Sequence, residues 1–340
     1  MKKRFLLPFF AFVVLSSCNN DKQILNRLND YNLTMESKGY HYGEAITLPE
    51  DVTKNAQSIS ISFGDKETSD LVIDPKFFTL GDNAVTFNIT KSNGEVLQQD
   101  ATINVYAKNP EASLGYTIVK EYPHDVNNFV QGFELEGDIV YESDGQQGSS
   151  QILKYRLGET KPLAVTPQPA EYFSEGLAIV GDKVYQLTWL NKKGFVYNKS
   201  DLSLIREFPY PNVMGEGWGL TYDGKNLIAS DGTKNLYFLD VEDPSKLVRY
   251  VSVAGHTQAF DKLNELEYHN GYIYANVWQQ PIILKIKPDT GEVVGKFDFT
   301  ALAQKHTKGS DDVLNGIAFK GENMLVTGKN WPVIYEVAIR

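Results

Sequence analysis

Hydrophobic and polar positions alternate in short runs along the chain, which is the pattern of half-buried β-strands. One five-residue pattern recurs in the C-terminal two thirds, with a polar or aromatic first residue, glycine or glutamate second and an apolar third. Its copies begin at Gln131, Glu175, Trp218, Asn264 and Asn315. These starting residues lie about 43 to 51 positions apart, a spacing typical of propeller blades.

A turn glycine and a short apolar strand follow each copy. The turn glycines are Gly137, Gly181, Gly224, Gly271 and Gly321. Because glycine adopts the positive φ that a tight hairpin demands, each repeat predicts an inner strand that turns back into a second one. A third apolar strand comes next. The repeats therefore predict a five-bladed β-propeller over residues 114–340, in which residues 116–119 complete the last blade.

Strand patterns also fill the region before the propeller. Residues 58–63 and 70–74 alternate, and Asn93-Gly94 marks a hairpin between 84–90 and 101–106. We expect a small immunoglobulin-like β-sandwich over residues 28–108, acting as a spacer or docking module. The predicted fold class is therefore all-β, a sandwich followed by a five-bladed propeller.

The N-terminus carries an export pattern. Three basic residues precede an apolar run over residues 5–15, which is too short to cross a bilayer and predicts a signal peptide over residues 1–17. Its end, Leu15-Ser16-Ser17-Cys18, resembles the lipobox of bacterial lipoproteins, in which the cysteine is lipidated, and Cys18 is the only cysteine. We expect a polar tether over residues 18–27 and a protein that is exported and lipid-anchored in the bacterial cell envelope, on its periplasmic or surface face.

Charge and composition exclude other partners. The formal net charge is −10, and no basic run with interleaved aromatic residues occurs, so we expect no nucleic-acid partner. Membrane attachment would then come from the lipid. The five histidines are scattered without the spacing of zinc ligands.

The starting residues of the repeats predict a pocket. The innermost strand of a blade lines the central channel, so the residue that begins it projects into the channel mouth. One acid, three amides and one indole would form this ring, a composition suited to a small-molecule site. Trp189 and Trp278 end second strands near the same mouth, and we expect them to form pocket walls with Trp218. Trp331 precedes a proline and is expected to be structural.

The propeller region resembles the glutaminyl cyclotransferases of plant and bacterial type, five-bladed enzymes that convert N-terminal glutamine to pyroglutamate with release of ammonia. The segments that carry this resemblance are 129–132, 173–177, 187–189, 217–221, 263–267, 274–278, 314–318 and 327–332. Val130 and Ser174 depart from the family's usual threonine and glycine. The resemblance implies peptides or proteins with N-terminal glutamine as substrates. It also implies functional positions at Phe129, Gln131, Phe173, Glu175, Trp189, Trp218, Asn264, Trp278 and Lys329.

These residue types suit the reaction. The substrate's α-amine must attack its own γ-carboxamide, so aromatic walls that hold the glutamine curled would supply much of the rate. Gln131 and Asn264 would make polar contacts with the substrate. Glu175 is the candidate proton shuttle, because a carboxylate among indoles should have a raised pKa. Lys329 would either stabilise negative charge on the γ-carbonyl oxygen or orient Glu175. The implied catalytic set is Glu175, Asn264 and Lys329.

Two alternative functions come from other classes. In a metal-dependent, lactonase-like hydrolase, the oxygen donors Glu175, Asn264 and Asn315 would surround a calcium ion. Only one inner strand begins with a carboxylate, so we expect no catalytic metal and no cofactor, and a structural calcium ion in the channel stays open. The other alternative is a non-catalytic surface binding propeller, because fold does not imply chemistry.

Overall fold

The computed structural model describes residues 21–31 and 39–340. The chain divides into two compact units, Met1–Tyr106 and Ala107–Arg340. The predicted signal peptide and Cys18 lie outside the described residues, as do residues 32–38. Within the described ranges, no helix is long and apolar enough to cross a membrane.

The first unit contains one five-stranded sheet in the order β1-β5-β4-β2-β3. Its elements are β1 (Tyr40–His41), α2 (Glu50–Thr53), β2 (Ser58–Phe63), β3 (Lys66–Thr68), β4 (Gly81–Thr90) and β5 (Val96–Tyr106). Strands β4 and β5 pair antiparallel, and Gly94 in the turn between them has a φ of 82°. The predicted Asn-Gly hairpin is thus confirmed.

The structure corrects two expectations for this unit. Its described residues form a single sheet, so the predicted β-sandwich is wrong, and residues 21–31 form a helix where a polar tether was expected up to residue 27. Ile24 and Leu28 lie one helical turn apart and are only 3% and 1% exposed. Lys91 forms an ion pair of 2.9 Å with Asp21 of this helix. The helix therefore buries apolar side chains in the place that a second sheet would take.

The second unit consists of five sheets, each with three or four consecutive antiparallel strands. The first comprises β8 (Val130–Glu136), β9 (Ile139–Asp144), β10 (Gln151–Arg156) and β11 (Ala164–Pro167), and the second β12 (Ser174–Val180), β13 (Lys183–Thr188), β14 (Lys193–Asn198) and β15 (Leu204–Pro209). The third comprises β16 (Leu220–Tyr222), β17 (Asn226–Ser230), β18 (Asn235–Asp240) and β19 (Leu247–Ser252). The fourth comprises β20 (Leu263–His269), β21 (Tyr272–Val277), β22 (Ile282–Ile286) and β23 (Val293–Asp298), and the fifth β24 (Leu314–Lys320), β25 (Asn323–Gly328) and β26 (Val333–Ile339).

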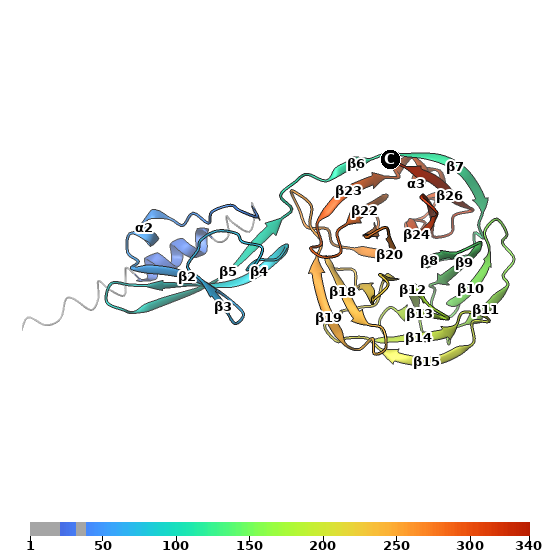
Figure 1. Ribbon diagram of the computed structural model, residues 1–340, viewed down its shortest axis with the longest axis horizontal. Coiled ribbons are helices and arrows are strands. Elements are labelled where there is room, and N and C mark those ends of the chain that lie inside the picture. Colours follow the sequence, from blue (N-terminus) through green and yellow to red (C-terminus); the bar gives the residue numbers. More distant parts are fainter. Residues whose placement is uncertain (1–20, 32–38) are drawn as a thin grey trace, which may run out of the picture. The chain divides into compact units, whose positions relative to one another are not determined.

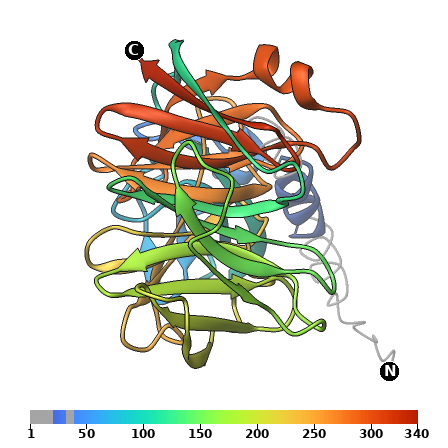
Figure 2. The same ribbon diagram turned by 90° about the vertical axis from the view of Figure 1, so that its right-hand side faces the viewer.

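The hairpin predictions are confirmed in every sheet of this unit. All five predicted turn glycines have positive φ, between 60° and 90°. Strand β7 (Tyr116–Pro123) pairs antiparallel with β26 and completes the fifth sheet, so the chain's C-terminal strand lies beside a strand from the start of the unit (Figure 2). Strand β6 (Ala112–Leu114) was not predicted and adds in parallel to β23. Helix α3 (Thr300–His306) lies between β23 and the first strand of the fifth sheet.

The five sheets lie around a common centre (Figure 1). Strand β8 contacts β12, and the first strands of the other sheets contact each other in turn until β24 contacts β8. Glycine in the second position of the repeats permits this approach: a Cβ on Gly219 would lie 1.9 Å from the carbonyl oxygen of Asn264. In the fourth sheet Glu265 stands in this position. Its carboxylate accepts the backbone N–H of Phe133 at 3.3 Å and that of Ile317 at 2.9 Å.

The apolar core fills the space between neighbouring sheets. One cluster joins Tyr185 and Leu187 of the second sheet to Leu227 and Tyr237 of the third. Because the core is made by the strand interiors, the starts of the inner strands are left to carry polar side chains.

Candidate active site

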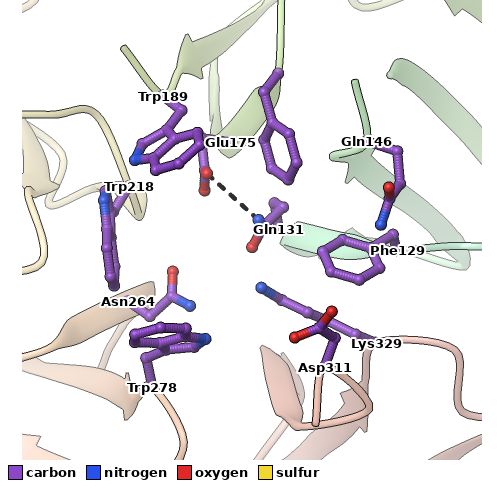
Figure 3. A pocket seen from close by; sticks show the side chains of 11 residues that line it. Phe129, Gln131, Gln146, Glu175, Trp189, Trp218, Asn264, Trp278, Asp311 and Lys329 are labelled. Atoms are coloured by element: carbon purple, nitrogen blue, oxygen red, sulfur yellow. Dashed lines mark hydrogen bonds between the residues drawn. The ribbon is translucent and has the colours of Figure 1, made fainter. Parts of the chain in front are cut away.

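A cavity of about 350 Å³ lies where the inner strands begin. All nine positions implied by the sequence resemblance line it, from five different sheets (Figure 3). The lining residues are Phe129, Gln131, Gln146, Phe173, Glu175, Trp189, Trp218, Asn264, Trp278, Asp311 and Lys329. Residues that lie far apart in the sequence are therefore brought together at one opening.

Local irregularities in the inner strands place the polar side chains. The pairing register shifts between Val130 and Gly132, and again at the starts of β12, β20 and β24. A β-bulge re-aims the side chain that it contains. Gln131, Glu175 and Asn264 lie within such shifts and reach the cavity, although neighbouring side chains pack into the core. Glycine inside a strand pattern was the available sequence signal at Gln131 and Glu175, whereas the shift around Asn264 has Glu265 in that position.

A second set of lining residues follows the second strand of four of the five sheets. Trp189 comes directly after β13, Trp278 after β21 and Lys329 after β25. The start of the first strand and the end of the second meet at the same end of a hairpin, so both reach the same opening. Gln146 follows β9 in the same way and was missed, although this positional rule would have found it. Asp311, in the loop between α3 and β24, was missed because no repeat marks that loop.

Aromatic rings form the cavity walls. The rings of Phe129 and Phe173 meet edge to face with centroids 6.2 Å apart, and Trp218 meets Trp278 at 5.7 Å and 88°. The Nζ of Lys329 lies 4.7 Å from the centroid of the Phe129 ring. Trp331 does not line the cavity and is fully buried, as expected of a structural residue. The walls are therefore packed against one another before any substrate enters.

Polar groups occupy the floor of the cavity. Gln131 Nε2 donates to Glu175 Oε1 at 3.3 Å (Figure 3), and Asn315 Nδ2 donates to Gln131 Oε1 at 3.3 Å. Asn315, which the sequence placed in the ring at the mouth, instead lies behind Gln131 and orients its amide. Asn264 Oδ1 is buried without a hydrogen-bond partner among the described residues, so this acceptor is available to a ligand.

Burial shifts the pKa values of two ionisable groups of the cavity toward each other, to about 8. Glu175 is only 4% exposed, and burial raises its pKa to about 8, with the Lys329 cation opposing the shift and Glu216 adding to it. Burial lowers the pKa of Lys329 to about 8, against the attraction of Glu175 and Asp311. A carboxyl group and an amine in one cavity thus change charge over the same pH range.

Among the residues that the structure describes, no group of three or more His, Cys, Asp or Glu side chains is placed to hold a metal ion. The expected absence of a metal and of a cofactor stays a prediction, and activity in the presence of a chelator tests the part that concerns the metal.

Comparison with known proteins places the chain in a family. The sequence model of the family described as glutamine cyclotransferase matches residues 90–339. The chain belongs to this family. It is 36% identical over 229 residues to glutaminyl-peptide cyclotransferase from Arabidopsis thaliana, covering 66% of this chain and 71% of the relative. The crystal structure of Myxococcus xanthus glutaminyl cyclase superposes with a TM-score of 0.61 at 34% identity, covering 67% of this chain and 98% of that one. The resemblance drawn from the motif segments is confirmed.

Proposed function

We propose that this chain is an acyltransferase that cyclises N-terminal glutamine of peptides and proteins to pyroglutamate and releases ammonia. One observation carries the proposal: a single cavity gathers all nine motif positions around a buried carboxylate. The names of both relatives describe glutaminyl cyclisation.

Binding and orientation come first. An intramolecular reaction gains most when the nucleophile and the carbonyl are held in contact, which corresponds to effective molarities of roughly 10⁵–10⁸ M. Trp218 and Trp278, perpendicular to each other, enclose the aliphatic part of the glutamine and exclude water. Asn264 Oδ1 accepts an N–H of the substrate, which satisfies a buried oxygen that has no partner among the described residues.

Glu175 carries out the proton transfers of the reaction. The α-amine nitrogen attacks the γ-carbonyl carbon and forms the ring C–N bond, while the C=O π electrons move onto the oxygen. The Glu175 carboxylate takes the proton that the amine loses. It then gives this proton to the carboxamide nitrogen as that C–N bond breaks, the C=O bond re-forms and ammonia leaves. Glu175 ends the cycle ionised, as it began, and a pKa of about 8 suits both steps.

The direct test is ammonia release from a glutamine-initiated dipeptide by the full chain, with and without a strong chelator. We expect turnover that the chelator does not reduce. The matched control is the asparagine-initiated dipeptide, which would have to close a strained four-membered ring and should release no ammonia. Loss of turnover with the chelator would favour the metal-dependent hydrolase, and no turnover in any condition would favour the binding propeller.

We infer further that the five sheets are the blades of a closed five-bladed propeller. Two observations support this inference. The inner strands contact one another in sequence from β8 round to β24 and back to β8. The pairing of β7 with β26 joins the start of the unit to its end within one sheet.

We also propose that the protein is exported and anchored by a lipid on Cys18 in the bacterial cell envelope, on the periplasmic or surface face. The support is the basic start, the short apolar run and the position of the single cysteine. Cells given a radiolabelled fatty acid should label the wild-type chain and place it in the membrane fraction. Cys18→Ser should abolish the label, and equal labelling of both chains would contradict the proposal.

A further inference from the structure

Glu216 lies outside the cavity and binds the indole N–H groups of two tryptophans that form its walls. It lies in the segment between β15 and β16, and its Oε2 accepts the indole N–H of Trp218 at 2.7 Å. The indole N–H of Trp189 donates to the same oxygen. Trp189 belongs to the second sheet and Trp218 to the third, so one carboxylate oxygen links side chains of two sheets. Glu216 does not itself line the cavity.

The backbone on both sides of Glu216 is fixed. The Nζ of Lys192 donates to the carbonyl oxygen of Gly215, whose N–H donates to Asp231 Oδ2 at 3.1 Å. The N–H of Gly217 donates to the carbonyl oxygen of Trp189 at 2.9 Å. The carboxylate of Glu216 is therefore presented to the two indoles by a segment that is held in place before substrate binds.

We propose that Glu216 is a positioning residue for the cyclisation, which fixes the indole planes of Trp189 and Trp218 around the substrate and acts on Glu175 through its charge. The inference rests on the proposed function and goes beyond the nine motif positions, which do not include Glu216.

The first part of the inference follows from the chemistry of indole. A tryptophan N–H needs an acceptor when water leaves its surroundings, and a carboxylate is a stronger acceptor than a neutral group. Trp189 is 36% exposed, so neighbouring side chains cover its ring only in part. Without Glu216 this ring would gain rotational freedom, and substrate binding would have to restrict it again.

Glu216 also acts on the site through its charge. Among the described residues, the charged groups that act on Glu175 are Lys329, which follows β25, and Glu216. Glu216 raises the pKa of Glu175, whereas Lys329 lowers it. Tyr210 also faces this carboxyl group, but burial raises the pKa of Tyr210, so it stays neutral in the relevant range. Removing the charge of Glu216 should therefore lower the pKa of Glu175.

Three variants of the full chain separate the two effects in the dipeptide assay. Glu216→Gln keeps an acceptor oxygen and the side-chain shape but removes the charge. Glu216→Asp keeps the charge but retracts it from the indoles, and Glu216→Ala removes both. We expect KM to rise about tenfold in the aspartate and alanine variants, the effect of losing a hydrogen bond to a charged group. In Glu216→Gln we expect KM to stay near the wild-type value and the acid limb of the pH profile to move to lower pH.

Glu171→Gln is the matched control, because it removes one negative charge from an exposed side chain in the segment before β12. It should leave both KM and the acid limb unchanged. Near-UV circular dichroism checks that each variant is folded. Two outcomes would overturn this inference: variants with wild-type KM and an unmoved acid limb, or variants in which kcat is lowered equally at every pH. In both cases turnover by the wild-type protein would still uphold the proposed function. Absence of wild-type turnover would overturn both.

Discussion

Replacing Glu175 by glutamine should reduce ammonia release by about 1,000-fold, within the range that general acid–base catalysis contributes. Glutamine has nearly the same shape and keeps a hydrogen-bonding partner for Gln131, but its amide cannot take a proton from the substrate amine and return it to the leaving nitrogen. The measurement is kcat with a glutamine-initiated dipeptide over a range of pH.

The same variant should stay folded and bind substrate. The substitution makes no cavity and removes a carboxyl group whose ionisation burial already disfavours, so the free energy of unfolding should change by no more than about 1 kcal/mol. Quenching of tryptophan fluorescence by the dipeptide measures its affinity separately from turnover. Full turnover in Glu175→Gln would remove Glu175 from the mechanism, and loss of affinity together with turnover would make its role one of binding.

The pH profile of the variant provides a further readout. In the wild-type protein, activity should rise as Glu175 becomes ionised near pH 8, where the substrate's own α-amine also loses its proton. The residual activity of Glu175→Gln should follow the α-amine alone. A wild-type profile with no acid limb in this range would contradict the assigned base.

The sequence predicted the cavity well because hairpin geometry fixes where its residues fall. Glu175 lies at the start of a first strand and Trp189 directly follows the second strand of the same sheet, so both were recognised from their positions in the repeat. Gln146 obeys the same rule and was overlooked because its neighbourhood lacks an aromatic residue. Asn315 begins a first strand like Glu175, yet its amide turns to Gln131 and the backbone of Val130 instead of the cavity. No periodicity distinguishes a side chain that lines a site from one that supports it.

Glu216 shows a second reason why sequence patterns miss functional residues. Its effect runs through two indole N–H groups from different sheets, and these contacts exist only after the sheets assemble. The first unit shows a third reason. Alternation identified the strands of its sheet, but strands alone do not say whether a sheet or a helix covers them. Ile24 and Leu28, at helical spacing within a polar stretch, were the overlooked signal.

Replacing Lys329 by methionine should lower kcat by about 100-fold, the lower end of the cost of removing an electrostatic stabiliser of a developing oxyanion. Methionine keeps the length of the side chain and its contact with Phe129 but removes the charge. The variant also changes the pH profile. Lys329 lowers the pKa of Glu175, so its removal should move the acid limb to higher pH.

The alkaline side of the profile separates the two roles considered for Lys329. Because the pKa of Lys329 is itself lowered to about 8, wild-type activity should fall at higher pH as the cation is lost, which makes the profile a narrow bell. The two limbs belong to an interacting pair, so variants are needed to assign them. In Lys329→Met the alkaline limb should disappear, and kcat should stay about 100-fold below the wild-type maximum at every pH, as expected of a group that stabilises the γ-carbonyl oxygen. If kcat instead recovers once the pH is high enough to ionise Glu175 fully, Lys329 acts only by holding and ionising Glu175, and the oxyanion role is wrong.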